Sequence, residues 1–243
     1  MAKELVTRGF TVYALDLRGR GDSNSIRGPF GMQAHAEDVL AVMNDIGDTA
    51  PVDLVGHSMG AFVVAALAGM APERIKRAFM IDGGVPFTMP SDQTIDEFLP
   101  KVLGPALKRL AMKFPDPETY ISYFRDQRAF SKGWSAALSE YASYDLRGDT
   151  ASTNPACVAA DSTELFGAGS ELVTTGLHSL PSSTLVIRAE RGLQDDAPLY
   201  PDTAVFDRFP QLRVVTLPDS NHYDIIMSPQ GVLGCISLMY PQT

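Results

Sequence analysis

The pentapeptide Gly56-His57-Ser58-Met59-Gly60 lies directly between an apolar run and a helix-like stretch. Val52–Val55 precedes it and Ala61–Met70 follows it. A serine at a sharp strand-to-helix turn has a strained backbone that lifts its hydroxyl clear of the sheet, and small residues two positions before and after it avoid clashes. The pattern therefore predicts a strand, a turn and a helix in direct succession, with Ser58 presented as a nucleophile.

The predicted turn also places Ser58 at the amino end of a helix. Free backbone N–H groups and a partial positive charge at that end stabilise a developing oxyanion. The N–H of Met59 is the natural first donor. The turn is thus suited to nucleophilic attack on a carbonyl group.

A serine hydroxyl is a poor nucleophile near neutral pH, so it needs a base and a group that orients the base. We prefer His222 as the base because it follows the last predicted strand, and loops at the carboxyl ends of strands gather site residues. We interpret His57 as structural, since its side chain should point away from that of Ser58. The remaining histidines are interpreted as surface or packing residues: His35 and His178.

The orienting acid is chosen among carboxylates that follow two of the predicted strands. We prefer Asp195 because its position in the loop leaves room to reach His222, and Pro198 restricts that loop. Three alternatives stay open: Glu190, Asp196 and Asp82. The chain order serine, acid, histidine holds with any of them.

Composition limits the class of protein. A chain of 243 residues, 45% of them hydrophobic, can bury one sizeable core. The net charge of -9 and the lack of a dense Lys/Arg cluster argue against nucleic acid as a partner. No apolar run approaches the roughly 20 residues that cross a bilayer, and no signal-peptide core is present. We therefore expect a cytoplasmic protein without a membrane span.

The sequence also bears on metals and cofactors. Cys157 and Cys235 lie far apart without metal-ligand spacing, so we expect two reduced thiols and no metal. The glycine-rich segment at 19–21 does not begin a dinucleotide-binding motif, because Asn24 stands where that motif has glycine. It is not a P-loop either, because no P-loop lysine follows. We expect no cofactor.

Helix-like and strand-like segments alternate along the chain, which predicts an α/β fold with a mostly parallel sheet flanked by helices. The predicted strands are Thr11–Leu15, Val52–Val55, Arg77–Ile81, Thr184–Ile187 and Leu212–Leu217. The helices predicted to flank them are Ala2–Arg8, Met32–Ile46, Ala61–Met70 and Gly231–Met239.

Strand-like patterns disappear between residues 85 and 183, where helical patterns take over. We interpret residues 85–183 as an inserted helical cap, and residues 1–84 and 184–243 as the core that brackets it. Eleven of the 21 aromatic residues lie in the cap, which predicts an apolar roof over the serine. The predicted cap helices are Thr94–Leu99, Ala106–Phe114, Glu118–Phe130 and Trp134–Tyr144.

Four segments together resemble the α/β-hydrolase superfamily: Asp16–Ser23, Gly56–Gly60, Ile81–Gly84 and Asp219–Tyr223. The resemblance spans nearly the whole chain and looks most like bacterial esterase and lipase-like members with a helical cap. It implies a serine hydrolase that cleaves a carboxylic ester or related acyl bond of a small apolar substrate through an acyl-enzyme. A serine at the turn argues against the haloalkane dehalogenase and epoxide hydrolase branches, which need a carboxylate there.

Two departures from the family pattern carry further expectations. Gly192 stands where many members carry the acid. In the family, three strands and a loop that supplies a second oxyanion N–H precede the segment that matches Met1–Phe10. We therefore expect Met1 to be an internal methionine of a longer protein; the alternative is that the sheet has re-paired and another N–H supplies the second oxyanion donor. We also expect Thr11–Leu15 and Val52–Val55 to lack a shared neighbouring strand.

Two other functions stay open on the sequence. The first is a degenerate member of the superfamily that binds a small molecule with little turnover, against which intact Ser58 and His222 count. The second is cofactor-free perhydrolysis, which some relatives with the same triad perform.

Overall fold

The computed structural model describes residues 1–47, 49–89, 91–166 and 170–241. Its main sheet has four strands in the order β1-β2-β5-β6, and every neighbouring pair is parallel. This arrangement confirms the predicted α/β architecture. The strands are β1 (Val52–His57), β2 (Ile75–Ile81), β5 (Leu185–Ala189) and β6 (Arg213–Leu217).

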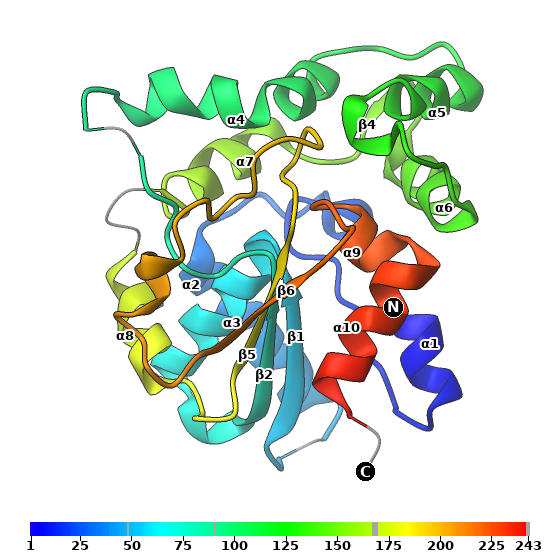
Figure 1. The fold of residues 1–243 in the computed structure, drawn as a ribbon. Coiled ribbons are helices and arrows are strands. Elements are labelled where there is room, and N and C mark those ends of the chain that lie inside the picture. The colour runs from blue at the N-terminus through cyan, green and yellow to red at the C-terminus, as the bar shows by residue number, and fades with distance from the viewer. Residues whose placement is uncertain (48, 90, 167–169, 242–243) are drawn as a thin grey trace.

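Helices cover both faces of this sheet (Figure 1). One face carries α2 (Met32–Asp45), α3 (Met59–Met70) and α8 (Glu171–Ser179). The other carries α9 (Asp224–Met227), α10 (Pro229–Met239) and α1 (Ala2–Thr7), which packs on α10. Short 3-10 turns are Gly21–Ser23, Pro72–Arg74, Arg128–Phe130 and Thr203–Phe206.

Alternating residues of β2 supply the two halves of the core. Met80 packs in the cluster that contains α3, whereas Phe79 and Ile81 pack in the cluster that contains Cys235 and Met239 of α10. Successive side chains of a strand point to opposite faces, so a strand covered on both faces is apolar throughout. This is why Arg77–Ile81 contains an uninterrupted apolar run.

The strand predicted at Thr11–Leu15 is wrong. None of the described strands includes these residues, and Tyr13 is 58% exposed. Alternating β-formers favour an extended backbone, but a strand also needs a ladder partner. Within the described residues β1 pairs with β2 alone, so the other edge of β1 has no strand partner among them. Val55 of β1 is 39% exposed.

The cap helices α4 (Ile95–Leu110), α5 (Pro117–Arg125), α6 (Ala136–Asp145) and α7 (Pro155–Ser162) lie together across one end of the sheet (Figure 1). Two predicted helices, Thr94–Leu99 and Ala106–Phe114, are largely one helix, α4, which continues through Pro100 and Pro105. The helix predicted to end at Phe130 ends at Arg125.

The cap differs from the prediction in two further respects. It contains a small antiparallel hairpin of β3 (Leu146–Arg147) and β4 (Thr150–Ala151), although no strand was expected there. Its last helix, α8, packs against α3 on the face of the sheet, so this part of residues 85–183 contributes to the core. None of the described helices has the length and apolar composition needed to cross a membrane.

Candidate functional site

Ser58 occupies a strained turn between β1 and α3. Its backbone angles are φ 54° and ψ -123°, a conformation that non-glycine residues rarely adopt, and it is the N-cap of α3. Met59 is therefore the first helical residue, and N–H groups of the first helical turn have no acceptor within the helix. The turn combines a raised serine with backbone donors.

The glycines around this turn have different roles. A Cβ on Gly56 would lie 2.3 Å from the carbonyl oxygen of Gly60, so the close approach of β1 to α3 requires glycine there. A Cβ on Gly60 itself would meet nothing within 4 Å, so the expected steric need for glycine at Gly60 is wrong. A Cβ on Gly83 would lie 2.3 Å from the carbonyl oxygen of Ser58, which makes Gly83 part of the same tight contact.

Parallel pairing brings the ends of the strands to one edge of the sheet. His57 is in register with Ile81, and Ile81 with Ile187. The amide of Ser58 donates to the carbonyl of Ile81 (2.8 Å), and the amide of Asp82 donates to that of Ile187 (2.8 Å). Ser58 and Asp82 therefore leave neighbouring strands at the same level.

His222 points at Asp82. Its Nδ1 donates to Oδ2 of Asp82 at 2.7 Å, and the two side chains are 3% and 1% exposed. The other oxygen of Asp82 accepts from the amide of Ala189 at 3.0 Å. The carboxylate is thus fixed by one backbone donor and fixes the imidazole in turn, which leaves Nε2 of His222 as the nitrogen that can accept a proton.

The preference for Asp195 as the partner of His222 is corrected by this pairing. Asp195 instead accepts from Nε of Arg191 at 2.6 Å and from Nδ2 of Asn221 at 3.3 Å. Burial disfavours its ionised form, but the bonds from Arg191 and Asn221 outweigh burial and lower the pKa of Asp195. The loop thus turns Asp195 toward Arg191 and Asn221 and away from the imidazole.

The other two alternatives also lie apart from the imidazole. Glu190 accepts from the amide of Asp219 at 3.0 Å and from Arg191, and Asp196 is exposed. Of the four carboxylates that the sequence left open, Asp82 is the one that the structure brings to His222.

His57 supports the loop that carries His222. Its Nε2 lies 2.8 Å from the carbonyl oxygen of His222, and the two rings are 4.6 Å apart. Burial, and secondarily the nearby His222, lower the pKa of His57 to about 3. The ring is therefore neutral, and its Nε2–H donates to the carbonyl, which agrees with the structural role predicted for it.

Asn221 was missed by the sequence analysis. It is fully buried, and its Oδ1 accepts from the amides of Tyr223 and Asp224, both at 2.9 Å. Its Nδ2 donates to the carbonyl of Ala129 in the cap at 2.6 Å. An asparagine a few residues before a helix is a signal for such local bonds, and here α9 begins three residues later, at Asp224. Asn221 thus fixes the backbone on which His222 is carried.

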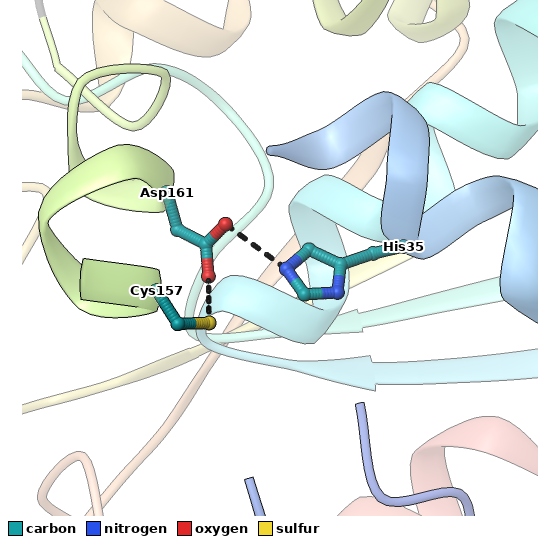
Figure 2. Close-up of side chains that lie close together, drawn as sticks. All are labelled: His35, Cys157 and Asp161. Carbon is teal, nitrogen blue, oxygen red and sulfur yellow. Dashed lines mark hydrogen bonds and ion pairs between the residues drawn. The ribbon is translucent and has the colours of Figure 1, made fainter. Parts of the chain in front are cut away.

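A second buried cluster joins the cap to the core (Figure 2). Asp161 of α7 accepts from Nε2 of His35 at 3.0 Å, from the amide of Gly31 at 2.9 Å and from Sγ of Cys157 at 3.2 Å. Arg20 also donates to Asp161, at 2.8 Å. The packing role expected for His35 is consistent with these contacts.

The same cluster contains residue types that bind metals. His35, Cys157 and Asp161 have donor atoms within 4.8 Å of one another. However, Arg20 donates to both Cys157 (2.7 Å) and Asp161, so a guanidinium already contacts two of the three donors and repels a cation there. Burial raises the pKa of the Cys157 thiol to about 12, which disfavours the thiolate that metals bind. The residues fit an ion pair better than a metal.

Comparison with known proteins gives two kinds of similarity. A family model described as "Alpha/beta hydrolase family" matches residues 2–234. N-formylmaleamate deformylase of Pseudomonas putida is 33% identical over 139 residues, which are 52% of this chain and 43% of the relative. A dihydrolipoyllysine-residue acetyltransferase component of the acetoin cleaving system of Pseudomonas putida is 33% identical over 107 residues, 44% of this chain and 29% of the relative. The chain thus spans less than half the length of these curated relatives.

Solved structures resemble a larger part of the chain. E-2-(acetamidomethylene)succinate hydrolase superposes with a TM-score of 0.75 at 20% identity, over 98% of this chain and 85% of that one. An esterase from a marine microorganism gives a TM-score of 0.68 at 15% identity, over 98% and 87%. At these identities the likeness shows the fold alone.

Proposed function

The chain belongs to the alpha/beta hydrolase family, and from this premise we propose that it is a serine hydrolase that cleaves a carboxylic ester or a related acyl bond. Family membership and the hydrolases among its neighbours support an enzyme that hydrolyses a substrate. The bond, the substrate and the residues named below are part of the proposal.

One observation carries it: the buried contact of 2.7 Å between Nδ1 of His222 and Oδ2 of Asp82, beside the turn of Ser58. An acid that holds the imidazole in one tautomer leaves the opposite nitrogen free to take the proton of a serine hydroxyl. We assign the triad to Ser58, His222 and Asp82.

The proposed reaction has two halves. Oγ of Ser58 attacks the acyl carbon while Nε2 of His222 takes the proton of the serine hydroxyl. The tetrahedral oxyanion then accepts a hydrogen bond from the N–H of Met59. His222 then gives the proton to the leaving alcohol, which departs and leaves an acyl-enzyme. In the second half, His222 takes a proton from water, the resulting hydroxide attacks the acyl carbon, and the proton returns to Ser58 as the acid is released.

A carbon–nitrogen acyl bond is the second candidate for cleavage. The observation that favours it is the relative named as a deformylase, which is 33% identical to about half of this chain. The same three side chains serve both bonds, because His222 can protonate an amine as it leaves.

The test is the intact mass of the chain after exposure to a fluorophosphonate, with Ser58→Ala as the matched control. The proposal expects one adduct on the original chain and none on the variant, because the reagent needs an activated serine. The chain would then be screened with p-nitrophenyl esters and N-formyl amides. No adduct on folded protein would contradict the proposal and would favour a binding protein with an inactive serine.

A further inference from the structure

A cavity of about 130 Å³ lies in the cap beside the loop that carries His222. Helices α4, α5 and α6 contribute most of its lining, and the core contributes Leu193, Gln194 and Tyr223. Tyr223 directly follows His222, and their rings meet edge to face with centroids 5.4 Å apart. The cavity therefore adjoins the proposed reaction centre.

Arg109 of α4 is the one charged residue among the described residues that line this cavity, and it is 9% exposed. Its Nη1 donates to both the hydroxyl of Tyr120 and Oδ2 of Asp145. The plane of the guanidinium also lies near the ring of Phe124, with Cζ 4.9 Å from the ring centroid. These contacts fix the position of Arg109 on one side.

The other side of the guanidinium is unused. Neither Nε nor Nη2 of Arg109 donates to any residue that the structure describes, and neither is among the described polar atoms that are sealed from solvent without a partner. These two N–H groups form the side-on edge of the guanidinium, which matches the two oxygens of a carboxylate. A buried arginine with a free bidentate edge has the donor geometry that a carboxylate needs.

The ion pair with Asp145 engages only Nη1 of Arg109. The carboxylate of Asp145 also accepts from Tyr120 and, at 2.8 Å, from Ser152, so Arg109 is one of three side-chain donors to it. Tyr223 adds a hydroxyl to the cavity lining, and burial raises the pKa of Tyr223, so this hydroxyl stays protonated and can donate. The residues that line the cavity thus include a guanidinium and a phenol hydroxyl as hydrogen-bond donors.

We propose that the cap cavity is a subsite that binds a carboxylate group of the substrate through the side-on edge of Arg109, with the scissile acyl bond at Ser58. The role as a substrate subsite rests on the proposed function, whereas carboxylate binding does not. A cavity of about 150 Å³ holds a benzene molecule, so about 130 Å³ accommodates a short chain that ends in a carboxylate.

The experiment compares an isosteric pair of probes, pentanoate and pentanamide, by calorimetric titration into the full chain. Arg109→Lys keeps the charge and the ion pair with Asp145 but loses the bidentate edge. We expect pentanoate to bind more tightly than pentanamide, and Arg109→Lys to weaken pentanoate about tenfold or more with little effect on pentanamide. Arg125→Lys, the same change at a half-exposed cap arginine, should change neither.

A second variant addresses the case in which Arg109→Lys does not fold. Ala106 lines the cavity, and Ala106→Leu adds three carbon atoms there while both residues of the Arg109–Asp145 ion pair are kept, so it should weaken the binding of both probes. Equal affinity for the two probes, pentanoate binding that survives both variants, or no saturable pentanoate binding would overturn the proposal.

The fluorophosphonate adduct on Ser58 is measured separately on each variant. Adduct formation without carboxylate binding refutes only the subsite, and carboxylate binding without an adduct refutes only the serine hydrolase. Where both hold, the p-nitrophenyl monoester of glutaric acid should have a higher kcat/KM than p-nitrophenyl pentanoate, and Arg109→Lys should remove the difference.

Discussion

The pKa of His57 predicts how the stability of the protein depends on pH. The pKa of His57 is lowered from 6.5 to about 3 by burial and by the nearby His222. Below pH 6.5 the unfolded chain therefore binds a proton at this position that the folded chain does not bind. Stability is then lost as the pH falls from 6.5 toward 3, since it rises with pH wherever the unfolded state holds more protons.

The size of the loss in stability follows from how far the pH lies below the pKa of the histidine in the unfolded chain. A pH of 5 lies about 1.5 units below the pKa of the histidine in the unfolded chain, and each unit corresponds to about 1.4 kcal/mol. His57 alone therefore lowers the free energy of unfolding at pH 5 by about 2 kcal/mol relative to pH 7.5. Glutamine at this position still donates an amide N–H to the carbonyl of His222 but does not titrate. His57→Gln should therefore lose about 2 kcal/mol less than the original chain between pH 7.5 and pH 5.

Urea unfolding at pH 7.5, 6 and 5 measures this difference, because the midpoint and slope give the free energy of unfolding at each pH. His178→Gln is the matched control, since His178 is exposed and packs only its ring against Phe209, with centroids 4.9 Å apart. Equal losses of free energy of unfolding in His57→Gln and in the original chain over this pH range would contradict the lowered pKa of His57.

Three further substitutions give distinct expectations. Asp82→Asn should lower kcat by about 10³- to 10⁴-fold because the amide favours the wrong tautomer of the imidazole, whereas Asp195→Asn should retain most turnover; equal losses in a p-nitrophenyl ester assay would contradict the assignment. Gly83→Ala should lower the free energy of unfolding in urea by about 1–3 kcal/mol because its Cβ would meet the backbone of Ser58. Gly60→Ala should be neutral or stabilising, and a tolerated Gly83→Ala would show that the turn can shift. Asp161→Asn should cost about 3 kcal/mol in the same measurement because it leaves Arg20 without its buried partner, and a loss as small as that of an exposed aspartate would contradict this.

The sequence predicted the architecture because the periodicity of each element survives in its own packing. The apolar run of β2 is buried on both faces, and the glycines at Gly56 and Gly83 lie where backbones approach closely. The strand predicted at Thr11–Leu15 is wrong for a different reason. Local preference favours an extended chain there, but pairing depends on a second strand, which is not a local property.

The preference for Asp195 as the acid that orients His222 is wrong for a related reason. Asp82 and Asp195 each follow a strand, and chain position does not say which carboxylate turns toward the imidazole. That depends on register: Ile81 pairs with both His57 and Ile187, which places Asp82 between the ends of two neighbouring strands. The side-on edge of Arg109 could not be predicted either, because the ion pair that orients it joins α4 to the end of α6.

The attachment of the cap to the core is uneven, and this has a consequence for exchange of ligands. Moving α7 would separate Asp161 from Arg20, His35 and the amide of Gly31 at once. Moving the start of α4 would break mainly apolar contacts, such as those of Phe98 and Leu99 with the core. Leaving a buried charge without its partner costs about 3–5 kcal/mol, whereas separating apolar side chains leaves no charge unpaired. We therefore expect small molecules to enter and leave beneath α4, with α7 remaining in place throughout each turnover.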